Sequence, residues 1–390
     1  AISLLTIALQ TEPGNLNALD ALAMAHAAAG DFAQAESVVR RGLAVDAGRP
    51  VAHLRLGMML TPQGKWDGAA RAFEEAIRRA PRLAAAHHNL GDALTKLHRP
   101  QEAIACFQRA LAIDSENPET FNSLGFALQR LRLWSAARRR YRHALALDPE
   151  FEKARYNLAL ASLFHREFEQ GWPEYEARLR CGPVRVTLRK QAGTIDLYER
   201  LPRWGGPAGG GTGSVAIWAE QGIGDQILFS TLIPELVATR VPFLYEVDRR
   251  LLPAYERTFP HGRFVALEDP PHVALRSANR VLLAGSLPGF LRRRREDFTQ
   301  QPVKLLSARP ERVAHYRQRL AASGPGLKAA LSWRSTRQDW FGETKGVTLT
   351  GFAALLKTPG VQFVDVQYGD TASERAAADA ATGVRLLHLD

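Results

Sequence analysis

The chain is 390 residues long, which is enough for two or three domains that each bury a core. Its apolar content of 46% is typical of a globular protein, and no run reaches the roughly 20 apolar residues of a membrane span. The net charge of +11 comes mostly from arginine, but no basic patch interleaved with aromatic residues accompanies it. A nucleic-acid partner is therefore not predicted.

Two cysteines, Cys106 and Cys181, are too few for a disulfide framework or a zinc site, so we expect a reducing, cytoplasmic setting. No signal peptide is visible, and the first residues resemble the middle of a helix, which predicts that the natural chain begins upstream. The arginine runs at 138–140 and 292–295 are interpreted as solvated helix faces.

Residues 1–180 contain an internal repeat with a period of 34. In registers that begin at residues 16, 50, 84, 118 and 152, the seventh position is leucine, the eighth is small and the twenty-fourth is valine or aromatic. In repeat order these are Leu22, Leu56, Leu90, Leu124 and Leu158, then Ala23, Gly57, Gly91, Gly125 and Ala159, then Val39, Phe73, Phe107, Tyr141 and Tyr175. A position that is always small suits close contact between helices, and we expect each repeat to be two antiparallel helices that bury their small and large positions against the next repeat.

This pattern resembles the tetratricopeptide repeat family, which implies a superhelix whose concave face binds a protein or peptide. Adaptable methionine and phenylalanine side chains on that face suit such a partner. Asparagines at the sixth position hold a peptide backbone in related glycosyltransferases, although Arg55 and Ser123 interrupt that ladder here. The alternative is that these residues only pack between repeats. The concave-face residues are Met24, Met58, His88, Asn89, Asn122, Phe126, Tyr156 and Asn157.

Residues 181–213 are predicted to be a connector, because proline and a cluster of glycines interrupt the helical pattern. Just before it, Pro173 is placed near the start of the last repeat's second helix, where proline is tolerated. Trp204 is predicted to dock the connector onto a domain, since a loose linker rarely carries tryptophan.

Residues 214–219 have the pattern of a buried strand that leads into a glycine turn, Glu220–Asp225. The residues after the turn have the apolar spacing of a helix. If they form a single helix, Pro234 must kink it. A strand, a glycine turn and a helix place a ligand at the carboxyl end of a strand in an open α/β sheet. Gly222 and Gly224 would let that ligand approach the backbone.

Two other interpretations of this turn stay open. An ordinary tight turn between a strand and a helix also favours glycine. A nicotinamide oxidoreductase would bind its dinucleotide here, with Glu246 as the acid that binds the ribose. However, Ile227 stands where the dinucleotide fingerprint needs a third small residue.

Strands and helices alternate through the rest of the chain, which predicts parallel sheets with helices on both faces. A proline-glycine break at 324–326 separates two Rossmann-like halves, residues 214–325 and 326–390, and the C-terminal half is expected to be incomplete. The expected strands are Val215–Ala219, Phe243–Val247, Arg263–Leu267, Arg280–Leu283, Leu327–Trp333, Val361–Gln367 and Val384–Leu389, and the expected helices include Pro310–Ala322 and Leu349–Lys357.

Three segments resemble bacterial tetratricopeptide-repeat glycosyltransferases: Trp218–Asp225, Leu201–Trp204, and Gly171–Arg178 in the last repeat. This family is similar to heptosyltransferases and distantly to O-linked N-acetylglucosamine transferases. The resemblance implies a GT-B fold, a nucleotide-sugar co-substrate, no metal or other cofactor, and transfer of a sugar to serine or threonine of a protein. Some members with this layout modify flagellin.

The resemblance also implies roles for single residues. Asp225 would be the general base toward the acceptor hydroxyl. Cationic side chains would hold the donor phosphates, where negative charge accumulates as the nucleotide leaves. The implied donor-binding set is Gln221, Gly222, Gly224, Ser332, Arg334, Arg337 and Lys345.

Alternatives accompany these roles. Asp225 is also placed to act as a helix N-cap, and Arg334 and Arg337 also fit a surface loop. The family's later nucleotide-binding segment is missing at Asp390, so this chain alone is expected to be truncated and inactive. The alternative function is a non-catalytic adaptor or chaperone-like protein with a degenerate α/β part.

Overall fold

The computed structural model describes residues 2–181, 200–207, 213–220, 222–268, 270–298, 305–333 and 347–389. The chain divides into two compact units, Ala1–Leu305 and Leu306–Asp390. The first holds the repeat helices and a four-stranded parallel sheet, and the second holds a three-stranded parallel sheet. The predicted helical solenoid and parallel α/β elements are confirmed, whereas a GT-B pairing of two halves stays a prediction. Among the described helices, none is long and apolar enough to cross a membrane.

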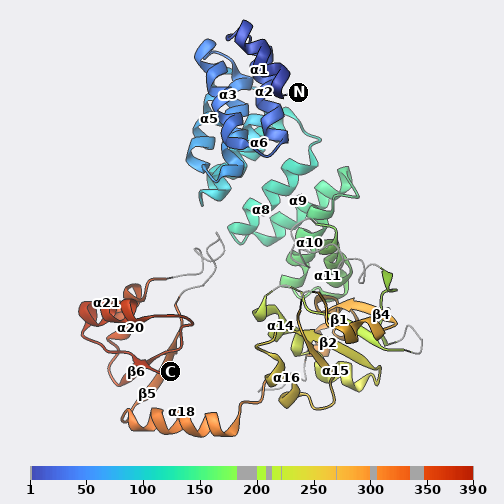
Figure 1. Cartoon of the computed structure of the whole chain (residues 1–390), viewed down its shortest axis with the longest axis vertical. Coiled ribbons are helices and arrows are strands. Elements are labelled where there is room, and N and C mark those ends of the chain that lie inside the picture. Colours follow the sequence, from blue (N-terminus) through green and yellow to red (C-terminus); the bar gives the residue numbers. More distant parts are fainter. Residues whose placement is uncertain are drawn as a thin grey trace. The chain divides into compact units, whose positions relative to one another are not determined.

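The repeats are pairs of helices that follow one another along the chain (Figure 1). The first helix of each pair begins where the 34-residue register begins, so the predicted period is confirmed. Asn15, Asp31 and Asn117 cap helices through their side chains, and Pro50 and Pro118 occupy first helical positions. The helices are α1 (Ile2–Thr11), followed by α2 (Leu16–Ala28) with α3 (Phe32–Val45), α4 (Pro50–Leu60) with α5 (Trp66–Arg79), α6 (Ala84–Lys96) with α7 (Pro100–Ile113), α8 (Pro118–Arg130) with α9 (Trp134–Leu147), and α10 (Glu152–Phe164) with α11 (Phe168–Tyr175).

The two helices of a repeat meet at one close contact. In α4, α6 and α8 the eighth position is glycine, and an added Cβ there would lie 2.3–2.6 Å from the aromatic ring at the twenty-fourth position. In the first repeat the twenty-fourth residue is the smaller Val39, and the eighth position is Ala23. The two positions are therefore matched in volume, as close packing requires. The glycine pairs are Gly57 with Phe73, Gly91 with Phe107, and Gly125 with Tyr141.

Gly91→Ala is expected to lower the free energy of unfolding by about 1–3 kcal/mol, because the added methyl group must displace the Phe107 ring from a closely packed contact. Urea unfolding followed by circular dichroism measures this change. Gly42→Ala in α3 is the control, since a Cβ there meets nothing within 4 Å. Alanine favours helix over glycine, so this control should be neutral or stabilising. An equal loss in both variants would contradict the packing argument.

Every repeat also turns between its helices through one residue with a left-handed backbone. This residue is at the fifteenth position, and its φ is 79° at Gly30, 72° at Gly64, and 60–61° at His98, Arg132 and Arg166. Glycine adopts this conformation easily, whereas a residue with a Cβ bears a cost of roughly 1–2 kcal/mol. The repeats therefore keep one turn geometry even where the residue does not favour it.

The second helix of the last repeat differs from the others. Pro173 lies inside α11 and not in its first turn, so its predicted placement was wrong. Proline has no N–H to donate, so regular helix ends two residues later and a 3₁₀ helix, η2 (Glu176–Leu179), follows. Leu179 packs against the core of the four-stranded sheet. The last repeat is therefore joined to the α/β part of the first unit.

The four-stranded sheet has the order β3-β2-β1-β4, and its strands match the predicted ones closely. The apolar stripe after the glycine turn is not one kinked helix, because Pro234 lies in the first turn of a second helix, α15. Trp204 is buried against Phe290, so its predicted docking is confirmed. The elements are β1 (Val215–Trp218), α14 (Ile223–Ser230), α15 (Ile233–Ala238), β2 (Phe243–Val247), α16 (Leu252–Thr258), β3 (Phe264–Ala266), η4 (Val273–Ser277), β4 (Arg280–Leu283), η5 (Ala284–Ser286), α17 (Pro288–Leu291) and η6 (Arg295–Phe298).

The second unit is built on the sheet β5-β6-β7. Trp333, Leu349 and Phe363 are buried in its core. The helix at Pro310–Ala322 belongs to this unit, whereas the sequence placed it with the preceding half. The elements are α18 (Pro310–Ala322), β5 (Leu327–Leu331), η7 (Leu349–Phe352), α20 (Ala353–Leu356), β6 (Val361–Asp365), α21 (Ala372–Thr382) and β7 (Leu387–His388).

Candidate functional site

One pocket opens on the first helices of neighbouring repeats, α6, α8 and α10, and we call it the groove pocket. Its volume is about 300 Å³. It brings together three of the predicted partner residues, Asn122, Phe126 and Asn157. The charged residues that line it are Asp92, Lys96 and Lys153. An apolar ring beside fixed amides is the composition of a polypeptide-binding site.

Two asparagines of neighbouring repeats are joined in this pocket. Asn157 Nδ2 donates a hydrogen bond to Asn122 Oδ1 at 2.8 Å, and Asn122 is only 2% exposed. Among the described residues, Asn122 Nδ2 and Asn157 Oδ1 have no partner. One amide donor and one carbonyl acceptor are therefore left, and these are the groups that an extended polypeptide backbone can satisfy.

The two sixth-position asparagines, Asn89 and Asn157, do not act alike, as the interruption of the ladder by Arg55 and Ser123 suggested. Asn89 Nδ2 donates to the Ala85 carbonyl of its own helix at 2.8 Å, so this side chain turns back on α6. Asn157 instead bonds Asn122, which is a fifth-position residue of the preceding repeat. The sixth-position spacing alone could not reveal a pairing between different positions.

The remaining predicted partner residues lie outside the groove pocket. Met24 and Met58 are 47% and 42% exposed, so they are accessible to a partner. His88 Nδ1 lies 2.9 Å from Thr120 Oγ1 of the next repeat. Tyr156 packs at 5.8 Å from Tyr175, and burial together with that neighbour raises the pKa of Tyr156 to about 12.

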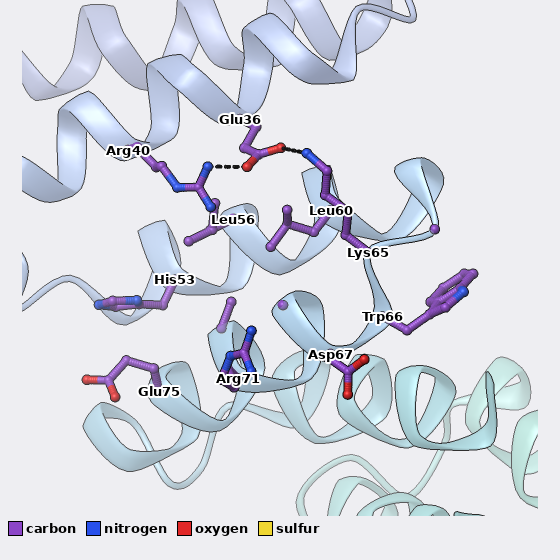
Figure 2. A pocket seen from close by; sticks show the side chains of 13 residues that line it. Glu36, Arg40, His53, Leu56, Leu60, Lys65, Trp66, Asp67, Arg71 and Glu75 are labelled. Atoms are coloured by element: carbon purple, nitrogen blue, oxygen red, sulfur yellow. Dashed lines mark hydrogen bonds and ion pairs between the residues drawn. The ribbon is translucent and has the colours of Figure 1, made fainter. Parts of the chain in front are cut away.

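A larger pocket of about 790 Å³ lies between α3 and α5 over α4, and Figure 2 shows it from close by. Its Glu36 carboxylate is buried and accepts hydrogen bonds from Lys65 Nζ at 2.8 Å, from Gln63 Nε2 at 2.9 Å, and from Arg40. Burial raises the pKa of Glu36, but the bonds from Lys65 and Gln63 outweigh it and hold the pKa below its usual value. Arg71 and Glu75 lie on the opposite side, so the pocket offers both signs of charge and defines no ligand class (Figure 2).

Asp225 lies in the first turn of α14 and is partly exposed. The helix cap is Gly222, whose N–H donates to Asp225 Oδ2 at 3.3 Å. Glycine has no side chain to return a bond, so the aspartate supplies one half of a capping box and is not itself the N-cap. Asp225 Oδ1 has no partner within the described part of the chain. The side chain thus stabilises the helix start and keeps one oxygen available for a ligand.

The two glycines of this turn leave open space beside Asp225. Gly222 has φ −87°, which any residue adopts, and an added Cβ would come no closer than 3.9 Å to Asp225 Oδ2. At Gly224 an added Cβ would meet nothing within 4 Å. Folding therefore does not require glycine at either position, and the open space leaves room for a ligand to approach the backbone.

Arg178 of η2 reaches into the α/β part and is fully buried. Its Nη2 donates to Glu220 Oε1 at 2.9 Å and to Ser286 Oγ at 2.8 Å, and its Nε lies 3.2 Å from Glu220 Oε2. Its Nη1 donates to Glu176 Oε1 at 2.7 Å. Burial lowers the pKa of the guanidinium, but the charges of Glu220 and Glu176 outweigh it and hold the pKa above its usual value. The guanidinium therefore stays charged and binds the Glu220 carboxylate through two nitrogens.

The arginine runs do not behave as solvated faces throughout. Arg292 is buried, and its Nε donates to Glu235 Oε1 at 2.8 Å. Arg138 forms a two-bond ion pair with Glu167 of the last repeat. Both interpretations were wrong at these positions, because a run of arginines does not tell which members find an acidic partner. Arg293 and Arg295 are exposed as predicted.

The geometry gives no support to a nicotinamide site in the first sheet. Glu246, the acid expected to bind a ribose, is fully buried within β2. The space at the ends of β1 and β4 is occupied by Arg178 and Glu220. A ribose hydroxyl would therefore not reach the Glu246 carboxylate.

Polar side chains gather at the carboxyl ends of the strands in the second unit, and we call this set the polar edge. The Ser332 hydroxyl donates to Gln367 Oε1 at 3.0 Å. Buried Asp365 accepts from Thr371 Oγ1 at 2.6 Å and lies 3.0 Å from His388 Nδ1. This edge of a parallel sheet is the usual place for a ligand. Ser332 is the member of the set that the sequence predicted.

Four polar-edge residues were not predicted, although a signal for them existed. The predicted strand Val361–Gln367 ends with Asp365 and Gln367, and the predicted strand Val384–Leu389 contains His388. Polar residues at the carboxyl ends of predicted parallel strands are that signal. Gln221, Arg334, Arg337 and Lys345 lie outside the described residues, and their donor-binding roles stay predictions.

Comparison with known proteins bears out the repeats. Family models described as tetratricopeptide repeat match residues 16–59, 49–116 and 82–150. The N-terminal part of the chain therefore consists of tetratricopeptide repeats, which imply a protein-binding role. The chain is also 30% identical over 284 residues to protein FlbA of Caulobacter vibrioides, and the match covers 60% of this chain and 46% of that protein. The chain thus spans less than half of that relative's length.

Solved structures of repeat proteins resemble the N-terminal part. YrrB, described as a TPR protein with an unusual peptide-binding site, is 19% identical with a TM-score of 0.39, and the match covers 47% of this chain and 94% of YrrB. MamA is 21% identical with a TM-score of 0.38, covering 41% and 93%. The pilus biogenesis factor PilW is 23% identical with a TM-score of 0.41, covering 44% and 81%.

Proposed function

We propose that the repeats capture an extended segment of a protein partner in the groove pocket. The observation that supports this most is the Asn122–Asn157 pair, which leaves one donor and one acceptor beside Phe126. A backbone peptide group of the partner can bond both asparagines, while a neighbouring side chain of the partner packs on the Phe126 ring. The lysines of the pocket favour partners with a nearby acidic residue.

Asn157→Ala is expected to weaken peptide binding about 10-fold, because it leaves a peptide group and Asn122 without a hydrogen-bond partner. Peptides selected from a random displayed library against the full chain serve as probes, and fluorescence anisotropy measures their affinity. Asn89→Ala is the matched control, since Asn89 bonds its own helix. Equal peptide affinities of the wild-type protein and both variants would contradict the proposal.

A second candidate function is sugar transfer from a nucleotide-sugar to serine or threonine of the captured protein. It is supported by Asp225 beside two glycines that folding does not require, and by the polar edge of a second parallel sheet. Asp225 would accept the proton of the acceptor hydroxyl. Flagellin as the acceptor rests on the family resemblance alone.

The adaptor alternative accounts for the groove pocket equally well and assigns no chemistry to the α/β part. Co-expression with candidate acceptors, flagellin among them, followed by intact-mass measurement separates the two functions. A discrete added mass on the acceptor supports transfer. Stable binding with an unchanged acceptor mass supports the adaptor.

A further inference from the structure

The first sheet reverses its strand order beside β1. In the order β3-β2-β1-β4 the chain runs from β1 outward through β2 to β3 and then crosses back to β4 on the other side of β1. In open α/β sheets this reversal opens a crevice at the carboxyl ends of the strands, where ligands usually bind. Here the loops that follow β1 and β4 contribute Glu220, Gly285 and Ser286.

A side chain from the last repeat fills this crevice. Arg178 donates to Glu220 on the β1 side and to Ser286 on the β4 side, and Glu220 Oε1 also accepts a hydrogen bond from the Gly285 N–H. The guanidinium lies 4.4 Å from the centre of the Tyr175 ring, which also belongs to the last repeat. The repeat thus supplies an internal cation where other sheets of this kind hold a ligand.

Glu220, which Arg178 binds, is the first residue of the glycine turn that leads to Asp225. Glu220 is two residues before Gly222, the cap of α14, and Gly222 in turn bonds Asp225. Gln226, the next residue along α14, is buried and accepts from the Asp248 N–H at 2.8 Å. The start of α14 is therefore held to the residue after β2 through Gln226, and Glu220, two residues before its cap, is held by Arg178.

We propose that Arg178 is a positioning residue, through which the last repeat sets the position of the start of α14, which carries Asp225. The structural part of this proposal depends only on the contacts described here. An effect of Arg178 on the reaction rate also depends on the proposed sugar transfer. A consequence is that the α/β part attains its native turn only when the last repeat is docked.

Hydrogen exchange in the full chain tests this proposal. Arg178→Lys keeps the charge, but one ammonium group cannot reproduce the planar fork that binds Glu220 and Ser286 together. We expect amides 222–230 to exchange at least about 10-fold faster in this variant, because the turn opens locally. Arg138→Lys is the matched control, since Arg138 is a partly buried arginine of the same unit that pairs with Glu167 and does not contact α14.

Two outcomes would overturn the proposal: unchanged exchange at 222–230 in Arg178→Lys, or an equal rise in β1, β2 and β4, which would mean plain destabilisation. If Arg178→Lys does not fold, Ser286→Ala removes one of its contacts more gently. That variant should speed exchange of the same amides by a smaller factor, and unchanged exchange there counts against the proposal.

Where the natural protein transfers sugar, Arg178→Lys should lower kcat on the order of 10-fold or more while the KM for the donor stays constant, because a misplaced base slows chemistry without loosening substrate. Arg138→Lys should leave kcat unchanged. A raised KM with normal kcat would contradict a positioning role. If the wild-type protein transfers nothing, the sugar-transfer proposal fails, and the exchange experiment still decides the role of Arg178.

Discussion

Glu220→Ala is expected to lower the free energy of unfolding of the first unit by about 3–5 kcal/mol, because it leaves the Arg178 guanidinium buried without its main counter-charge. The substitution also removes the acceptor of the Gly285 N–H. Denaturant unfolding at neutral pH, followed by tryptophan fluorescence, measures the loss. A buried ion pair is costly to break from one side even where the intact pair adds little net stability.

The control for this prediction is Glu268→Ala. Glu268 pairs with Arg249 at 3.3 Å, and both side chains are well exposed. Exposed pairs contribute roughly 0–1 kcal/mol, so this variant should unfold almost as the wild type does. A loss at Glu220 no larger than the loss at Glu268 would mean that water reaches Arg178 and that the junction is looser than described.

Asp225→Asn is expected to lower the rate of sugar transfer by about 10²–10⁴-fold, which is the usual contribution of a general base. The asparagine oxygen can still accept from the Gly222 N–H, so the start of α14 and peptide capture should be preserved. Radiolabelled nucleotide-sugar and a protein acceptor measure transfer, and the displayed peptides measure capture.

Asp248→Asn is the matched control for Asp225, because Asp248 follows the neighbouring strand β2 and pairs with Arg250 at 2.9 Å. It should retain nearly full transfer. Full activity in Asp225→Asn would remove the base from the proposed chemistry and leave the adaptor function. Loss of capture in the same variant would mean that the aspartate belongs to the partner-binding surface.

The repeats could be predicted from the sequence almost completely, and the junction could not. A small eighth residue and a large twenty-fourth residue recur every 34 residues, so the period and the helix pairs follow from the sequence, whereas the direct contact of Gly91 with Phe107 within one repeat is seen in the structure. Arg178 and Glu220 occur once each and are 42 residues apart. Their pairing depends on how η2 docks on the sheet, which no periodicity encodes.

The candidate site also contains residues that the sequence predicted and residues that it could not predict. Asp225 and its glycines were found because a glycine turn after a buried strand has a known use. The Asn122–Asn157 bond joins different positions of neighbouring repeats, so position-by-position comparison of repeats could not find it. The polar edge could have been found, because Asp365 and Gln367 end a strand that the sequence did predict.

Arg178 also constrains how this architecture can be taken apart or recombined. Repeats nearer the N-terminal side contact their neighbours in the stack, so whole 34-residue modules there can be exchanged or duplicated with a repeating interface intact. The module that ends in η2 is different, since its removal would leave the buried Glu220 carboxylate without Arg178. Chimeras that graft a foreign repeat array should therefore be spliced before Glu152, with the final helical hairpin inherited from the α/β part.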